Sequence, residues 1–230
     1  MVFREAAREA KLYAMKADML PNTQVTVYYD PLCGWCYGAT PSLHKLGEQP
    51  GVNVELVPTG LFAGANARAM DARFAEHAWS ADQRIERLTG QRFSNSYREQ
   101  VLADRATLLD SRPATVALTA IALTHPTREL HALEAIQKAR YVEGRDVTDY
   151  AVLAPIIAGI GLADVASRVA APDSVLLAAY EARTENARRA LQALGATGVP
   201  TLVVRGRVLE SQALYGPFED LLRQLQRLDT

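Results

Sequence analysis

The stretch Gln24-Val-Thr-Val-Tyr-Tyr-Asp-Pro-Leu-Cys-Gly-Trp-Cys-Tyr-Gly38 decides the fold. Its first six residues alternate and are rich in β-branched and aromatic side chains, which predicts a β-strand. A turn is expected at Asp30-Pro31-Leu32, and a helix from Cys33 to about Gly47. A second strand is predicted at Val52–Pro58. Because the order is β-α-β, we expect the two strands to be parallel and joined by a right-handed crossover.

The C-terminal part predicts a β-hairpin followed by a helix. The strands Thr201–Val204 and Arg207–Glu210 flank a short turn, Arg205-Gly206, in which glycine suits a positive φ. The segment Pro217–Leu228 places phenylalanine and leucine side chains at helical spacing. The two ends of the chain therefore predict β-α-β and β-β-α.

More than a hundred residues beyond what one crossover helix needs lie between Pro58 and Pro200. Their pattern is almost wholly helical. Helices are expected at Ala114–Leu123, from Leu130 to Glu143-Gly144, from Asp146 or Thr148 to Gly159 or Gly161, and at Pro172–Leu194. An amphipathic helix is also predicted at residues 3–18. We therefore expect an N-terminal helical extension at 1–20, an α/β domain formed by 22–62 and 182–230, and a helical insertion domain at 63–181.

Composition excludes several classes of protein. The 230 residues are 49% hydrophobic and carry a formal net charge of −1, with no basic run. A real core is expected, whereas general electrostatic binding to nucleic acid or to an anionic membrane is not. Charges interrupt the first twenty residues, and no uncharged stretch reaches the length of about 20 residues that a bilayer requires. We therefore expect a cytoplasmic protein without a signal peptide.

The two cysteines form a Cys-x-x-Cys pair at the predicted strand-to-helix turn. Unpaired backbone N–H groups and the helix dipole at this position favour a thiolate over a thiol. Cys33 is therefore the expected exposed nucleophile. Cys36 lies one turn later on the same side of the helix and is the expected resolving thiol. Between them, Gly34 and Trp35 are expected to influence the stability of the thiolate.

Two other interpretations of the cysteine pair compete with a redox site. The cysteines can be structural residues of a core, or they can form half of a zinc site, which needs four ligands. No second cysteine pair is present, and the four histidines show no regular ligand spacing; they are His44, His77, His125 and His131. No metal is therefore expected, and a dithiol redox site is favoured.

A second motif, Gly198-Val-Pro-Thr201, opens the third predicted strand. Proline at the start of a strand lacks a backbone donor and belongs at an edge or a bend. If the Val199–Pro200 bond is cis, the turn presents the backbone of Val199 beside Cys33, where it can pair with an extended substrate. A plain turn proline is the alternative. After the hairpin, Ser211 and Tyr215 are candidates to line a groove.

The combination of these motifs resembles the thioredoxin fold and, with its helical insertion, the DsbA family of thiol–disulfide oxidoreductases. The motifs are Asp30-Pro-Leu-Cys-Gly-Trp-Cys-Tyr-Gly38, Ala139-Arg-Tyr-Val-Glu-Gly-Arg-Asp146 and Gly198-Val-Pro-Thr-Leu-Val-Val204. They look most like a cytosolic branch described as protein-disulfide isomerases, near the FrnE-like group. The resemblance runs from about Gln24 to Leu228. It implies that Cys33 is the nucleophile, Cys36 the resolving thiol and Pro200 a cis-proline.

The leading hypothesis is a thiol–disulfide oxidoreductase or isomerase that acts on protein or small-molecule thiols and disulfides. Gly34, Trp35, Val199 and Pro200 are the predicted substrate-binding residues. No bound cofactor is expected, and glutathione is a candidate thiol co-substrate. A glutathione-dependent isomerase or transferase of the kappa or hydroxychromene-carboxylate type is one alternative, and a chaperone or binding module is another. Oxidation, reduction and isomerisation all remain open, as does the oligomeric state.

Overall fold

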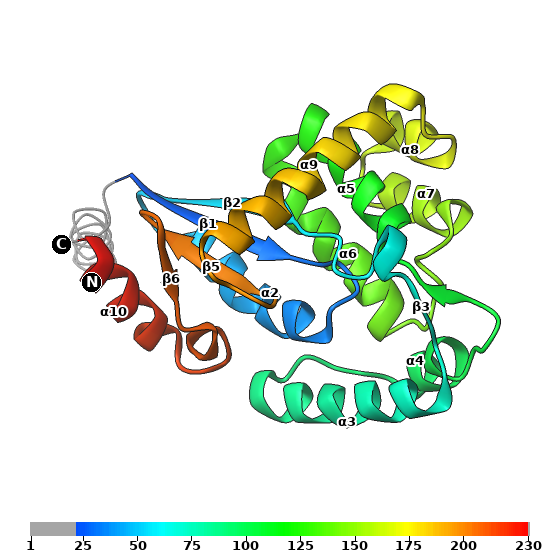
Figure 1. The fold of residues 1–230 in the computed structure, drawn as a ribbon, viewed down its shortest axis with the longest axis horizontal. Helices are drawn as coiled ribbons and strands as arrows, with labels where there is room; N and C mark the ends of the chain where they lie inside the picture. Colours follow the sequence, from blue (N-terminus) through cyan, green and yellow to red (C-terminus); the bar gives the residue numbers. More distant parts are fainter. Residues whose placement is uncertain (1–21, 230) are drawn as a thin grey trace, which may run out of the picture.

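The computed structural model describes residues 22–229. Successive side chains of β1 (Thr23–Tyr29) point to opposite faces of a sheet. The four strands lie in the order β2-β1-β5-β6 (Figure 1). The strand β2 (Val52–Pro58) is parallel to β1, and β5 (Thr201–Val204) is antiparallel to it. The last strand, β6 (Arg207–Leu209), forms a hairpin with β5. The predicted strands, their pairing direction and the hairpin are confirmed.

The period of two along β1 separates the two faces of the sheet. On one face Val25, Val27 and Tyr29 join the main core, which includes α2 (Gly34–Gly47). On the other face Tyr28 packs in a small separate cluster with residues of β5 and of α9 (Ser174–Ala193). Figure 1 shows α9 crossing in front of the strands, with α2 on the far side. The predicted α/β class is therefore confirmed, with helices on both faces.

The predicted insertion, residues 63–181, lies between β2 and β5, and most of it is helical. Its helices are α3 (Ala72–Thr89), α4 (Asn95–Tyr97), α5 (Arg112–Thr124), α6 (Glu129–Tyr141), α7 (Tyr150–Gly159), α8 (Ala163–Ala170) and the start of α9, with single turns η1 (Gly64–Asn66) and η3 (Pro126–Arg128) and a π-helical turn η2 (Arg98–Leu102). Two short strands, β3 (Arg68–Ala69) and β4 (Leu108–Leu109), pair within it. After the hairpin come η4 (Ser211–Tyr215) and α10 (Phe218–Asp229).

The structure corrects one detail of the predicted insertion. The helix α7 is capped by Asp149, whose side chain accepts a hydrogen bond from the backbone N–H of Ala151. The predicted caps, Asp146 and Thr148, instead bond to each other in the preceding turn. Asp149 prevails because it directly precedes the first helical residue, where a carboxylate reaches the free N–H groups. The helix predicted at residues 3–18 lies outside the described part of the chain.

A buried polar cluster ties the insertion to the sheet. The Tyr29 hydroxyl on β1 donates to Glu129 Oε1 of α6 at 3.1 Å. Arg183 of α9 donates to both oxygens of Glu129, at 2.7 and 2.8 Å, and to the backbone carbonyl of Leu56 on β2. The side chains of Glu129 and Arg183 are 8% and 21% exposed. Two strands and two helices therefore meet at one ion pair.

Replacing Arg183 with methionine tests how far this cluster holds the fold together. The change leaves a buried carboxylate without its partner, so we expect a loss of about 3–5 kcal/mol in the free energy of unfolding, measured in urea. Arg189→Met on the same helix breaks only exposed contacts, with Glu185 and Asn186, and is expected to cost under about 1 kcal/mol. The double variant Arg183→Met/Glu129→Gln should recover part of the loss. Equal losses for Arg183→Met and Arg189→Met would contradict this interpretation.

Candidate active site

The turn before Cys33 is organised by a buried carboxylate. Asp30 Oδ1 accepts from the backbone N–H of Leu32 at 2.9 Å, and the Asp30 carbonyl accepts from the N–H of Cys33 at 3.2 Å. Asp30 Oδ2 accepts from the hydroxyl of Ser111, in the insertion, at 2.7 Å. Burial raises the pKa of Asp30, and its hydrogen bonds partly oppose that rise. The loop that leads into Cys33 is thus tied to the insertion.

Cys33 stands at the N-cap of α2, in extended backbone conformation with φ −86° and ψ 119°. Its sulfur therefore lies where the free N–H groups and the dipole of the helix favour negative charge. Cys36 is one turn further along, and the two thiols are not joined by a disulfide in this structure. Burial raises the pKa of the Cys36 thiol well above its usual value, and the neighbouring Cys33 sulfur adds to the rise.

The prediction that Cys33 is exposed is wrong. Its exposed fraction is 8%, against 2% for Cys36. The loop before β5 contributes to this cover, because the Val199 carbonyl oxygen lies 3.7 Å from Cys33 Sγ. The Val199–Pro200 peptide bond in that loop is cis. The structure therefore brings Cys33, Cys36, Val199 and Pro200 together, although 163 positions of the chain separate Cys36 from Val199.

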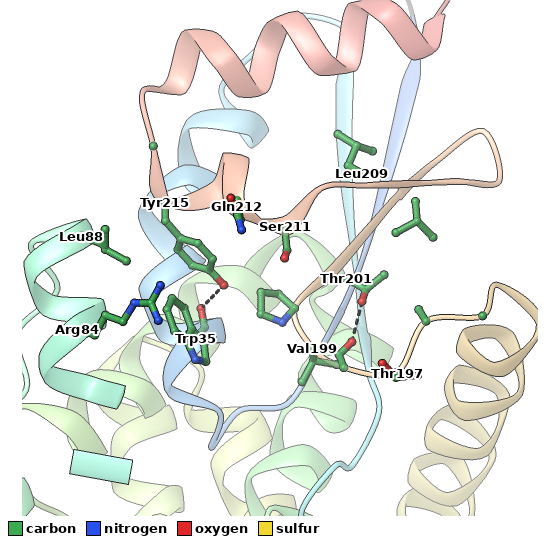
Figure 2. A pocket seen from close by; sticks show the side chains of 16 residues that line it. Trp35, Arg84, Leu88, Thr197, Val199, Thr201, Leu209, Ser211, Gln212 and Tyr215 are labelled. Atoms are coloured by element: carbon green, nitrogen blue, oxygen red, sulfur yellow. Dashed lines mark hydrogen bonds between the residues drawn. The ribbon is translucent and has the colours of Figure 1, made fainter. Parts of the chain in front are cut away.

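A groove of about 780 Å³ opens beside this site (Figure 2). Its lining comes from α2, α3, the Val199–Pro200 loop, β6 and η4. Trp35 and Tyr215 pack edge to face in it, with ring centroids 5.0 Å apart, and the Tyr215 hydroxyl donates to the Trp35 carbonyl. The Arg84 guanidinium lies 5.8 Å from the Trp35 ring centroid. The groove thus offers aromatic surface, one cation and the backbone of Val199 next to Cys33.

The predicted substrate-binding residues divide into two sets. Trp35, Val199 and Pro200 line the groove, together with Ser211 and Tyr215. Gly34 does not line it and faces the insertion instead. A Cβ atom at Gly34 would overlap Asp82 Oδ1 of α3, and a Cβ at Gly38 would lie 2.5 Å from Ile85 Cγ2. Glycine at both positions therefore lets α3 approach the start of α2 closely.

Asp82 was missed by sequence reasoning. It is 4% exposed, and its Oδ2 accepts from the Tyr97 hydroxyl at 3.1 Å. Burial raises its pKa to about 7, although the Tyr97 hydrogen bond and the charge of Arg140 lower it. The available signal was its helical spacing with Ala75 and Ile85, the other buried residues of α3. A carboxylate on an otherwise apolar helix face will be buried, and a buried carboxylate needs a hydrogen-bond donor or a cation beside it.

Within 22–229, no group of three or more His, Cys, Asp or Glu side chains is arranged to hold a metal ion. In the same part of the chain, no helix has both the length and the apolar character needed to cross a bilayer.

Comparison with known proteins identifies related chains. The model of the DSBA-like thioredoxin domain family matches residues 24–223. Cytosolic disulfide reductase DsbM from Pseudomonas aeruginosa is 32% identical, with a TM-score of 0.76, over 89% of this chain and 97% of its own. A structure of the same reductase with GSH is 31% identical, with a TM-score of 0.75, over 89% and 98% of the two chains. Oxidoreductase DsbA from Xylella fastidiosa shares the fold at 18% identity, with a TM-score of 0.52 over 92% and 87% of the two chains. No curated protein sequence matches this chain.

The contact between Gly34 and Asp82 predicts a specific coupling. Gly34→Ala should lower the free energy of unfolding by about 1–3 kcal/mol, because the added methyl group overlaps a carboxylate that Tyr97 holds in place. In the Asp82→Ala background the same change should cost much less. Gly47→Ala, in the same helix but with open space around its Cβ, is the control and should be near neutral. Equal costs of Gly34→Ala in the two backgrounds would contradict the packing described here.

Proposed function

This chain belongs to the family of DsbA-like thioredoxin domains, and we propose that it is a cytoplasmic disulfide reductase that uses glutathione as its thiol co-substrate. One observation carries the proposal: Cys33 stands at the N-terminus of α2 beside an open groove, with Cys36 buried behind it. A nucleophilic thiol and an inward resolving thiol are the two groups that disulfide exchange requires. The resemblance to the DsbA family stated from the sequence is confirmed.

In the proposed reaction the Cys33 thiolate attacks a substrate disulfide. A bond forms between Cys33 and one substrate sulfur, and the other substrate sulfur leaves as a thiolate, which takes up a proton. Cys36 then loses its proton and attacks the Cys33 sulfur, which releases the second substrate thiol and forms the Cys33–Cys36 disulfide. Two glutathione molecules restore the dithiol and leave as one glutathione disulfide. Two electrons therefore pass from glutathione to the substrate in each cycle.

Three features support glutathione and the reductive direction. The Val199 carbonyl beside Cys33 can accept a hydrogen bond from the backbone of a bound peptide. Arg84 in the groove supplies a cation for a carboxylate, and glutathione carries two carboxylates. The 32% identical relative from P. aeruginosa is named as a cytosolic disulfide reductase, and it has also been solved with GSH. The cytoplasmic location is proposed because the same relative is named as cytosolic.

Cys36→Ala should trap the first intermediate. Without the resolving thiol, the mixed disulfide at Cys33 cannot be released from within the protein, so we expect a stable adduct when the variant is incubated with glutathione disulfide. Mass spectrometry under non-reducing conditions should show one glutathione per chain, and reductant should remove it. Cys33→Ala is the matched control and should form far less adduct, because Cys36 is buried. Equal adduct formation by the two variants would overturn the assignment of roles.

The reduction potential of the Cys33–Cys36 pair tests the direction. We expect a value close to that of thioredoxin, about −270 mV, from equilibration with reduced and oxidised glutathione. A value near about −120 mV would make the protein an oxidant and would overturn the reductase assignment. Binding of glutathione without any disulfide exchange would instead favour a glutathione-dependent isomerase or transferase.

A further inference from the structure

One backbone carbonyl near the start of α2 takes a hydrogen bond from outside the helix. Pro41 lies inside α2. Proline has no N–H to donate to the carbonyl four residues earlier, and its ring also crowds that carbonyl. In α2 this carbonyl belongs to Tyr37, which directly follows Cys36 and is 4% exposed. A buried carbonyl without a donor is costly, so Tyr37 needs a partner from another element.

The insertion supplies that partner. Gln91 Nε2 donates to the Tyr37 carbonyl at 3.1 Å. The chain reaches this position directly after α3, where Gly90 adopts φ 75° and ends the helix. The backbone N–H of Gln91 donates to Thr89 Oγ1 at 3.2 Å, and Thr89 Oγ1 donates to the Ile85 carbonyl at 2.8 Å. The end of α3 therefore holds the amide of Gln91 against α2.

The same segment also holds the side chain of Tyr37. The Tyr37 hydroxyl donates to the Arg92 carbonyl at 3.3 Å. The Tyr37 ring packs edge to face against Phe93, with ring centroids 5.2 Å apart. Residues 91–93 therefore contact both the backbone and the side chain of the residue that follows Cys36.

The turn that carries both cysteines ends at Tyr37, whose backbone N–H donates to the Cys33 carbonyl at 3.0 Å. In the resolving step the Cys36 sulfur, after losing its proton, bonds to the Cys33 sulfur, and the substrate sulfur leaves as a thiolate. An error of about 1 Å in the alignment of reacting atoms slows such a step on the order of 100-fold. We propose that Gln91 is a positioning residue for this step, because its bond to Tyr37 holds the turn from which Cys36 attacks.

The first step of the exchange depends on other contacts. Cys33 is held by the turn before α2, where its backbone N–H donates to the Asp30 carbonyl. The substrate approaches Cys33 from the groove and the Val199 loop. Loss of the Gln91 bond should therefore slow the second step and spare the first, whereas a purely structural role would lower stability without changing the ratio of the two rates. This inference rests on the proposed disulfide exchange.

Gln91→Met tests the proposal, since it removes the donor and keeps the length of the side chain. Reduced protein is mixed rapidly with glutathione disulfide and quenched with acid at intervals. Mass spectrometry then measures the dithiol, the glutathione adduct and the internal disulfide. We expect the dithiol to disappear at the wild-type rate, whereas the adduct should convert to the internal disulfide roughly tenfold more slowly. The adduct should therefore accumulate transiently in the variant.

Gln49→Met is the matched control. Gln49 Nε2 also donates to a backbone carbonyl of α2, that of Lys45 at 3.0 Å, but at the far end of the helix. This variant should leave both rates unchanged. Pro41→Ala provides a second background, because the restored N–H can bond to the Tyr37 carbonyl within the helix. In that background Gln91→Met should slow the second step far less.

The proposal is overturned if the adduct of Gln91→Met converts at the wild-type rate, or if both steps slow by the same factor. Equal slowing of the second step in Gln49→Met, or in the two backgrounds at position 41, would also overturn it. If Gln91→Met does not fold, Gln91→Asn takes its place, because its amide is one carbon shorter and loses the bond. Failure of the proposed function is distinguishable, because the wild-type protein would then form neither adduct nor internal disulfide with glutathione disulfide.

Discussion

The free backbone N–H groups at the start of α2 attract negative charge, and the rest of the site is arranged around that helix end. Cys33 occupies the N-cap, and the Val199 carbonyl approaches its sulfur from the loop before β5. Asp30 holds the preceding turn through backbone hydrogen bonds. The strand-turn-helix geometry thus places the Cys33 sulfur at the positive end of a helix.

The insertion contributes to this site as directly as the sheet does. One helix, α3, presents Asp82 and Ile85 to α2, while Arg84 and Leu88 line the groove. The close approach depends on the absence of side chains at Gly34 and Gly38. The helix α3 therefore both packs against the start of α2 and forms part of the groove lining. The buried ion pair of Arg183 and Glu129 ties two other helices of the chain, α6 and α9, to the sheet.

Sequence reasoning predicted the strands, their pairing and the position of Cys33 because each depends on local signals. Alternation, a Pro-containing turn and the Cys-x-x-Cys spacing are all readable within a few residues. It failed for the exposure of Cys33, since the loop that contributes to its cover lies more than 160 positions away. The cap of α7 was misplaced because Asp146, Thr148 and Asp149 are all good caps, and only the backbone conformation selects among them.

The sequence by itself determined the α/β class, the helical insertion and the cysteine pair at a helix N-terminus, because these follow from periodicity, turn residues and spacing. Only the tertiary structure decided that Gly34 faces a carboxylate instead of the groove, and that Arg84, Trp35 and Tyr215 line one groove with Val199. The physical reason is that these contacts join segments far apart in the chain. The burial of Asp82 and the resulting rise in its pKa arise only when α3 packs against α2.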